Sequence, residues 1–259
     1  MRKKTWSTVI SQEEVAPAIY SMWLDEREMA AAAKPGQFLS LYCADGARLL
    51  PRPISLCEVD KEKGALRIVY RVAGAGTREL SMLHTGDKAS VMGVLGNGFP
   101  LQGVQGKRVL IIGGGIGIPP MVELARALAG GNDNKIILGY RDGDIFLTDE
   151  LKKSGEVFIA TEDGSIGTRG NVMDAISKHH LNGDIIFACG PTPMLRAVKA
   201  YAAEHHIECY LSLEERMACG VGACLACVCK TKEVDSHSNV HNKRICKDGP
   251  VFNASEVEI

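Results

Sequence analysis

Four cysteines near the C-terminus constrain this chain more than any other feature of its sequence. Cys219, Cys224 and Cys227 are separated by four and two residues, and Cys246 follows after eighteen more. This is the plant-type spacing of a [2Fe–2S] cluster, C-x4-C-x2-C followed by a distant fourth cysteine. Three of the four thiolates then come from one tight loop, which predicts a cluster-binding module at this end of the chain.

The residues between these cysteines fit the same prediction. Gly220 and Gly222 lack a Cβ and tolerate positive φ, so the backbone there can fold closely around inorganic sulfides. Backbone N–H groups turned toward the sulfurs would help to set the reduction potential. The alternative is a structural zinc site. Zinc sites usually use two CxxC pairs, however, and only Cys224 and Cys227 form such a pair here.

Length and composition limit the other function classes. The 259 residues allow two domains and a small module, and the net charge of −1 gives no basic excess for nucleic acid. The first residues are basic but lead into no apolar region, so no signal peptide is expected. Residues 109–128, the longest apolar stretch, are interrupted by glycines, prolines and charges and cannot span a membrane. Nine cysteines, an odd number, suit metal-bound thiols in a reducing cytoplasm better than a disulfide framework.

The first hundred residues have the pattern of short strands. The segments 39–43, 54–59 and 66–72 are rich in apolar residues and bounded by turns, without a long helix between them. This pattern predicts a small antiparallel barrel. One of its strands is stiffened by a proline and presents a guanidinium and a hydroxyl that suit a phosphate group, although a solvated arginine at a strand end is the alternative. The motif consists of Arg52, Pro53, Ile54 and Ser55.

A second phosphate-seeking feature follows the next strand. Tyr70 and Arg71 end that strand, a glycine turn with Gly76 follows, and Thr77 is predicted to cap a short helix over 77–83. Free N–H groups at a helix start attract anions, although a plain strand–turn–helix connection is the alternative. Tyr70 can stack on a flat ring or simply belong to the core. Two such features in one barrel favour a bound nucleotide.

The middle of the chain has the pattern of a nucleotide-binding α/β domain. A continuous apolar strand at 107–112 ends in a glycine turn, and a helix with prolines in its first turn follows at 118–128. In this context a backbone can approach a pyrophosphate, although isoleucine at position 118 breaks a strict GxGxxG. The glycines of the turn are Gly113, Gly114, Gly115 and Gly117.

Further strands and helices alternate along this part of the chain, which predicts an open parallel sheet. The strands are predicted at 135–140, 157–160 and 184–189. The helical stretches lie near 147–152, 170–179 and 193–204. The last strand leads into a second turn, Cys189, Gly190 and Pro191, at the strand ends where α/β folds bind ligands. Cys189 is either a buried core thiol or a group beside a nicotinamide, and its position leaves both open.

Together these motifs resemble the ferredoxin–NADP reductase superfamily and, within it, the electron-transfer subunits of bacterial NAD-dependent (class 1B) dihydroorotate dehydrogenase. The resemblance spans nearly the whole chain, and the segments 96–99, 212–230 and 244–252 carry it together with the turns and strand motifs above. It implies an oxidoreductase subunit with three parts. These are an antiparallel β-barrel FAD domain at residues 1–101, an α/β parallel-sheet NAD domain at 102–210 and a [2Fe–2S] module at 211–259.

The resemblance also implies the cofactor contacts. FAD would contact Arg52, Pro53, Ile54, Ser55, Val69, Tyr70, Arg71, Gly76 and Thr77. NAD would lie across Gly113, Gly114, Gly115 and Gly117 on one side and Cys189, Gly190 and Pro191 on the other. The cluster ligands would be Cys219, Cys224, Cys227 and Cys246. The chain has no candidate catalytic acid, base or nucleophile, which fits a protein whose chemistry belongs to its cofactors.

The partner implied by the resemblance is an FMN-containing catalytic subunit that oxidises dihydroorotate to orotate in pyrimidine biosynthesis. The two proteins would form a heterotetramer with two copies of each. Electrons would pass from FMN through the cluster to FAD, and a hydride would then pass to NAD⁺. The alternatives are a related reductase subunit with a ferredoxin- or sulfide-linked partner, and a zinc-clasped module without catalysis.

Two smaller questions stay open in the sequence. Cys229, His237 and His241 lie near the cluster cysteines, and Rieske centres do use histidines, but four cysteines in register favour a polar surface loop. The choice between NAD and NADP is also undecided. Asp142 could accept a hydrogen bond from a ribose hydroxyl, or Arg141 could hold a 2′-phosphate.

Overall fold

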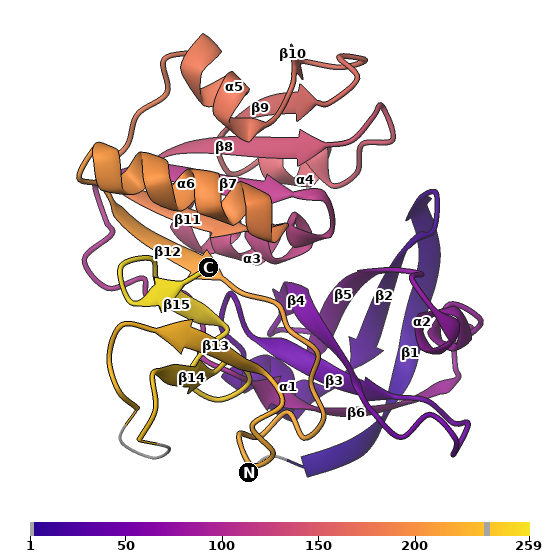
Figure 1. The fold of residues 1–259 in the computed structure, drawn as a ribbon. Helices are drawn as coiled ribbons and strands as arrows, with labels where there is room; N and C mark the ends of the chain where they lie inside the picture. The colour runs from indigo at the N-terminus through magenta and orange to yellow at the C-terminus, as the bar shows by residue number, and fades with distance from the viewer. Residues whose placement is uncertain (1–2, 236–238) are drawn as a thin grey trace.

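The computed structural model describes residues 3–235 and 239–259. It contains an N-terminal barrel, a sheet wound with helices and a small C-terminal module, which Figure 1 shows in indigo-purple, magenta-orange and orange-yellow. This architecture confirms the predicted fold class. Within the described ranges, every helix is too short or too polar to cross a bilayer.

The barrel is closed by six antiparallel strands in the order β1-β2-β5-β4-β3-β6. They are β1 (Lys3–Ala16), β2 (Ile19–Asp25), β3 (Phe38–Tyr42), β4 (Arg52–Asp60), β5 (Ala65–Arg71) and β6 (Lys88–Leu95). Alternating apolar residues fill the interior, and they include Leu39, Leu41 and Val91. Two short helices, α1 (Arg27–Ala32) and α2 (Ala75–Leu80), lie in its connections.

One local prediction in the barrel is wrong. Helix α2 begins at Ala75, with Gly74 as its N-cap, so Thr77 is the third residue of the first turn and not the N-cap residue. The Thr77 hydroxyl instead accepts hydrogen bonds from the backbone N–H groups of Ala73 and Gly74, at 2.9 and 3.2 Å. Glycine tolerates the extended N-cap geometry (φ −170°) as any residue does, and the threonine hydroxyl reaches back from the turn to the preceding donors.

The second part is a seven-stranded sheet in the order β10-β9-β8-β7-β11-β12-β15, parallel except for its last strand. Its strands are β7 (Arg108–Gly114), β8 (Asp133–Tyr140), β9 (Glu156–Thr161), β10 (Thr168–Arg169), β11 (Ile185–Cys189), β12 (Glu208–Ser212) and β15 (Val251–Asn253). The helices are the 3₁₀ turn η1 (Gly115–Gly117), α3 (Pro119–Leu128), α4 (Thr148–Lys152), α5 (Val172–Lys178) and α6 (Thr192–Glu204). The central strands β7 and β11 are buried on both faces, which explains their unbroken apolar runs.

The C-terminal module is attached to both other parts. Its own sheet has the order β14-β13-β16, formed by β13 (Val228–Thr231), β14 (Asn242–Arg244) and β16 (Val257–Glu258). Strand β15 leaves the module and pairs antiparallel with β12 at the edge of the large sheet. A parallel bridge between Asn97 and Pro250 ties it to the end of the barrel. The position of the module is therefore fixed relative to both the barrel and the large sheet.

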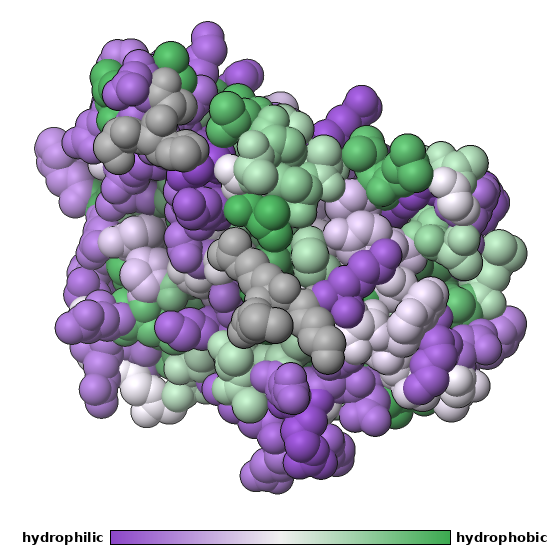
Figure 2. All heavy atoms as spheres, turned by 90° about the horizontal axis from the view of Figure 1, so that it is seen from below, coloured by the Kyte–Doolittle hydropathy of each residue, from purple (hydrophilic) through white to green (hydrophobic). Residues whose placement is uncertain are grey.

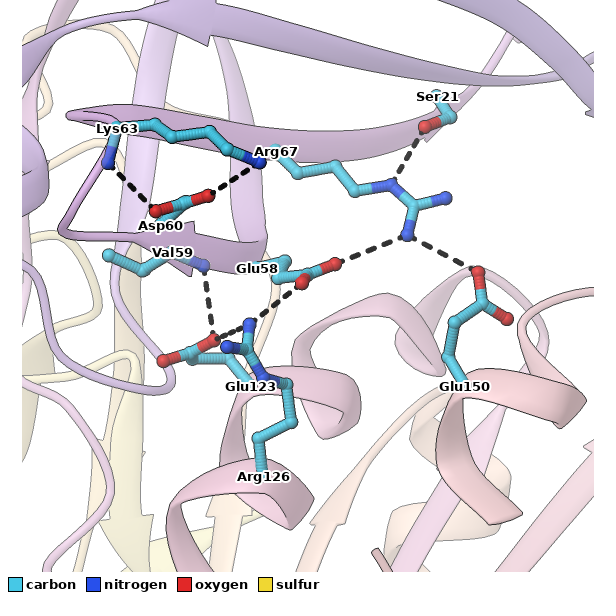
Figure 3. Close-up of polar contacts among 9 residues, drawn as sticks. All are labelled: Ser21, Glu58, Val59, Asp60, Lys63, Arg67, Glu123, Arg126 and Glu150. Atoms are coloured by element: carbon cyan, nitrogen blue, oxygen red, sulfur yellow. Dashed lines mark hydrogen bonds and ion pairs between the residues drawn. The ribbon is translucent and has the colours of Figure 1, made fainter. Parts of the chain in front are cut away.

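A network of charged side chains joins the barrel to the nucleotide sheet (Figure 3). Its centre is Arg67 on β5, which is only 7% exposed. The guanidinium donates to Ser21 Oγ at 2.9 Å within the barrel and lies 3.4 Å from the Glu58 carboxylate. It also reaches Glu150 of helix α4 at 3.3 Å, across the junction.

The same network continues onto helix α3. Glu123 accepts a hydrogen bond from the backbone N–H of Val59 on β4 at 3.0 Å. Arg126, one turn along α3, lies 2.8 Å from Glu58 and 3.2 Å from Glu123. Because α3 begins directly after the glycine turn of β7, these contacts fix that turn relative to the barrel.

Candidate functional site

A cavity of about 550 Å³ opens where the barrel, the nucleotide sheet and the C-terminal module meet. Predicted FAD contacts line it: Pro53, Ile54, Ser55, Val69, Tyr70 and Arg71. The opposite wall comes from Ile116, Pro120, Pro250 and the segment 213–217. Strands β4 and β5 thus bring two motifs that are distant in sequence onto one wall. Its size and its apolar lining with a few polar groups suit a flat aromatic ligand.

The remaining predicted FAD residues lie beside this cavity. The Arg52 side chain lies against Gly76, where an added Cβ would come within 2.0 Å of the guanidinium Nε. Arg52 also donates to the carbonyl oxygen of Leu50 at 2.7 Å. Glycine is therefore required at 76 for this arginine to lie across the start of α2. A guanidinium beside free N–H groups of a first helical turn is a suitable place for a pyrophosphate.

Tyr70 is part of the barrel core as well as of the cavity wall. Its ring stacks on Tyr20 at a centroid distance of 6.1 Å, and its hydroxyl donates to Gln12 at 2.8 Å. Burial raises the pKa of the Tyr70 phenol, and the neighbouring Tyr20 adds to that effect. The phenol therefore stays neutral and held by Gln12, and Tyr70 supplies an apolar edge to the cavity.

A second cavity, of about 340 Å³, lies at the carboxyl ends of the parallel strands. Its floor is formed by the two predicted turns, with Gly114, Gly115 and Gly117 from one and Gly190 and Pro191 from the other. The turns pack closely, because a Cβ at Gly117 would lie 2.5 Å from the backbone of Cys189. This is the end of an α/β sheet at which nucleotides bind.

Two of the residues predicted to contact NAD do not reach this cavity. Gly113 lies in β7 and Cys189 in β11, and neither residue lines either cavity. Cys189 is fully buried, and burial raises the pKa of its thiol. Of the two interpretations left open by the sequence, the core thiol fits this position. Its backbone still contributes, since Gly117 packs against it.

The two cavities share a wall, which the sequence did not reveal. Arg71, Ile116 and Glu214 line both of them. Glu214 follows the carboxyl end of β12, the same sheet end at which the turns lie, and this position is the signal that could have identified it. The Glu214 side chain is open to solvent through the cleft, yet the cleft walls desolvate its carboxyl and raise its pKa.

The second cavity extends to residues that could distinguish NAD from NADP. Glu162 and Arg141 line it, and Arg141 and Asp142 also line an adjoining cavity of about 310 Å³. The Asp142 carboxylate is engaged by Arg141 at 3.1 Å and by the backbone N–H of Asp144 at 3.1 Å. Glu162, not considered from the sequence, therefore presents a carboxylate beside the glycine turns.

The four predicted cluster cysteines are brought together in the C-terminal module as two pairs. Cys219 and Cys224 are in side-chain contact, and so are Cys227 and Cys246. Among residues 3–235 and 239–259, no three histidine, cysteine, aspartate or glutamate side chains lie close enough to hold a single metal ion. Two bridging sulfides leave each iron of a [2Fe–2S] cluster two places for thiolates, so two pairs fit that cluster.

The backbone around these sulfurs is arranged for thiolates. Burial opposes ionisation of Cys219, but N–H groups of Val221, Ala223 and Cys224 point at its sulfur and lower its pKa to about 6. Gly220 and Gly222 have φ of +67° and +86°, which the loop needs to turn those N–H groups inward. Contact with Cys246, which also donates its backbone N–H at 3.4 Å, lowers the pKa of Cys227 to about 6.

The other candidate ligands near the module are not part of this arrangement. Cys229 donates to the carbonyl oxygen of Lys243 at 3.6 Å, and burial raises its thiol pKa to about 11. His241 is exposed and its ring Nδ1 lies 2.9 Å from the carbonyl oxygen of Lys232. His237 lies outside the described residues. The histidine-containing alternative therefore gains no support from Cys229 or His241.

Two parts of the chain match known protein families. Residues 214–258 match the iron-sulfur cluster binding domain of dihydroorotate dehydrogenase B, and residues 111–200 match the oxidoreductase NAD-binding domain. The dihydroorotate dehydrogenase B (NAD(+)) electron transfer subunit of Bacillus velezensis is 43% identical over 261 residues, covering 99% of this chain and all of that protein. The chain belongs to this family of electron transfer subunits. The family member of Geobacillus thermodenitrificans is 44% identical over 254 residues, with 96% of each chain covered.

Solved structures agree with the family assignment. An NADH-dependent reduced ferredoxin–NADP oxidoreductase, described for flavin-based electron bifurcation, has a TM-score of 0.87 and 30% identity, covering 100% of this chain and 91% of that chain. Phthalate dioxygenase reductase, a modular protein for electron transfer from pyridine nucleotides to [2Fe–2S], has a TM-score of 0.64 at 17% identity, covering 94% of each chain. The second similarity shows a shared fold.

Proposed function

We propose that this chain is the electron-transfer subunit through which a dihydroorotate-oxidising partner reduces NAD⁺ in pyrimidine biosynthesis. One observation carries the proposal. The segment 213–217 lines the larger cavity, and Glu214 within it also lines the glycine-turn cavity. Two residues further along the chain is Cys219, the first of the four paired cysteines. A flavin site, a nicotinamide site and a cluster site are therefore joined by one short stretch of chain.

The barrel residues in this proposal hold FAD. Ser55, Val69 and Tyr70 form the wall against which a flavin ring would lie, and Arg52 beside Gly76 would bind the pyrophosphate. Thr77 steadies the turn before α2 through its bonds to Ala73 and Gly74. When bound, FAD exchanges a hydride with NAD and single electrons with an iron–sulfur cluster.

The nucleotide domain orients NAD(H) toward the same wall. The turns at Gly114–Gly117 and Gly190–Pro191 let a backbone approach the dinucleotide. Arg71 and Glu214, shared by both cavities, place one positive and one negative group where the two cofactors would meet. Glu162, whose carboxylate would oppose a 2′-phosphate, supports NAD as the nucleotide over NADP.

The C-terminal module supplies the thiolates for the cluster. Cys219, Cys224, Cys227 and Cys246 are proposed as its four ligands, two on each iron. We also propose that the chain divides into a flavin part at 1–101, a nucleotide part at 102–210 and a cluster part at 211–259. Strand β15 of the cluster part pairs with β12 at the edge of the large sheet.

The partner that we propose is an FMN-containing catalytic subunit, in a cytoplasmic heterotetramer with two copies of each chain. The cluster loop offers a surface for it. Residues 223–226 are all exposed, and Leu225 among them is 45% exposed with φ of +58°. Figure 2 views the face that includes the lower end of the barrel and the C-terminal module, and hydrophobic residues gather in its upper middle. An exposed apolar loop that carries Cys224 suits a protein contact that needs short electron-transfer distance.

Anaerobic purification and spectroscopy test the proposal. The absorbance spectrum should contain flavin and iron–sulfur bands, and NADH should bleach both. Expression with the catalytic subunit should give a complex that reduces NAD⁺ when dihydroorotate is added. A colourless preparation that contains zinc, or a loaded complex without this activity, would contradict the proposal.

A second candidate, a similar reductase subunit for a different redox partner, is favoured by one observation. The ferredoxin–NADP oxidoreductase described above aligns over the whole chain at 30% identity. The same preparation separates the two. Flavin and cluster bands that bleach with NADH, together with ferredoxin reduction and no dihydroorotate-dependent activity in complex with the catalytic subunit, would favour this candidate.

A further inference from the structure

Two buried serine hydroxyls lie on the outer face of barrel strands β3 and β6, where the C-terminal module packs. Ser40 is 0% exposed and Ser90 is 4% exposed. Their neighbours in sequence, Leu39, Leu41 and Val91, point into the barrel core, so both serines point outward. In the strand pairing, Ser40 is opposite Met92 and Ser90 is opposite Tyr42, which makes the two serines diagonal neighbours.

Neither serine has a hydrogen-bond partner. In the described part of the chain, the Oγ atoms of Ser40 and Ser90 are the only buried hydroxyls without one. A buried hydroxyl that makes no hydrogen bond destabilises a fold, so such groups in native proteins usually have an acceptor. These hydroxyls therefore need a hydrogen-bond acceptor that is not part of this chain.

The cluster loop packs directly on Ser40. A Cβ added at Gly220 would lie 3.1 Å from Ser40 Oγ and 3.5 Å from the terminal carbon of Met92. Cys219, the first of the four paired cysteines, directly precedes Gly220 in this loop. The orphaned hydroxyl therefore faces the side of the loop that begins with Cys219.

We infer that Ser40 donates its O–H to a sulfur of the [2Fe–2S] cluster on the Cys219 side and raises the reduction potential of that cluster. This inference rests on the proposed function, which places the cluster in this loop. Reduction adds one negative charge to the cluster, so a hydroxyl donor stabilises the reduced form more than the oxidised form. Phe38, two residues before Ser40 on the same strand face, lines the flavin cavity. Strand β3 thus connects the flavin cavity with the cluster loop. By raising the potential of the cluster, Ser40 changes how readily an electron passes between the two sites.

Redox titration of Ser40→Ala, followed by electron paramagnetic resonance, tests this inference. The equilibrium constant for reducing the cluster should fall about tenfold, a shift of about 59 mV toward negative potential for one electron. Ser7→Ala is the matched control. Ser7 is an equally buried serine of the same barrel (1% exposed), but its hydroxyl donates to Glu26 at 2.6 Å. Its removal should leave the cluster potential unchanged.

A second readout does not depend on the potential. In D₂O, pulsed resonance of the reduced cluster should detect one strongly coupled exchangeable deuteron fewer in Ser40→Ala than in wild type, and Ser40→Thr should restore it. An unchanged potential and deuteron count in a cluster-loaded Ser40→Ala protein would overturn the role of Ser40 alone. Equal shifts in Ser40→Ala and Ser7→Ala would also overturn it. A wild-type protein that never shows a [2Fe–2S] signal would overturn the cluster assignment and this inference together.

Discussion

Replacement of Arg67 by methionine tests whether the charged network in Figure 3 holds the two nucleotide-binding domains together. Methionine keeps the unbranched apolar stem and removes the guanidinium. Arg67 is 7% exposed, and its bond to Ser21 Oγ, at 2.9 Å, is a buried bond to a charged group. Such a bond contributes about 1.5–3 kcal/mol.

The two ion pairs of Arg67 contribute less than this bond. Glu58 and Glu150 lie 3.4 and 3.3 Å away, and their side chains are 23% and 36% exposed, so water screens both pairs. Each then contributes about 0.2–1 kcal/mol. Summed, these contributions predict that Arg67→Met lowers the free energy of unfolding of the FAD-loaded protein by about 2–5 kcal/mol. Glu150→Gln, which removes only the pair across the junction, should lower it by less than about 1 kcal/mol.

Urea unfolding and rapid mixing with NADH measure the two consequences. The control is Lys63→Met, also on the barrel but 83% exposed and paired with Asp60, where a change within about 0.5 kcal/mol is expected. Because residues of both the barrel and the nucleotide sheet line the two cavities, a looser junction should slow flavin reduction at saturating NADH by about tenfold. Arg67→Met that unfolds like Lys63→Met, or that reduces flavin at the wild-type rate, would refute this reasoning.

Three further predictions follow from the site. Cys224→Ser should abolish dihydroorotate-dependent NAD⁺ reduction in the complex, while NADH oxidation by an artificial acceptor continues; retained coupling would contradict the ligand assignment. Arg52→Ala should weaken FAD binding by about 1.5–3 kcal/mol, seen as flavin lost on gel filtration, and full occupancy would exclude Arg52 as the phosphate ligand. Burial raises the pKa of the Glu123 carboxyl despite the Val59 N–H and Arg126. The unfolded chain therefore releases this proton first, and stability falls as pH rises toward the raised pKa. Glu123→Gln should flatten that fall in urea unfolding as the pH rises above the ordinary glutamate pKa of about 4.5, and an unchanged profile would argue against it.

The features that could be predicted from the sequence are those that depend on residues close together in the chain. Cysteine spacing, glycine turns and apolar strands depend on residues close in the chain, so the paired thiols and the parallel sheet follow from them. The cap of α2 was misassigned for the same reason. Thr77 has the right side chain for an N-cap, but Gly74 precedes it in a turn whose backbone starts the helix earlier. N-cap propensity therefore indicated that a helix begins here, but it did not indicate the residue at which the helix begins.

The features missed were those created by distant segments. Glu214 and Glu162 are ordinary surface acids in the sequence, and only the winding of the sheet brings them to the strand ends with Arg71. Strand β15 was not expected in the large sheet, because a three-residue strand carries almost no periodic signal. The buried hydroxyl of Ser40 was likewise invisible, since its burial depends on a loop 180 positions later in the chain.

The position of the segment 213–219 explains why an electron carrier of this kind needs so few reactive side chains. Strand β12 ends at Ser212, and the chain then crosses the mouth of both cavities before it reaches Cys219. The paired cysteines that follow range from exposed at Cys224 to fully buried at Cys246. One part of the module therefore rests on the barrel beside the flavin cavity, while another part meets solvent. That gradient is what a relay requires, because an electron must pass from a separate protein to a water-excluded site without a mobile carrier. The protein contributes distance, burial and hydrogen bonds, and these are the quantities that the Ser40 and Cys224 variants change.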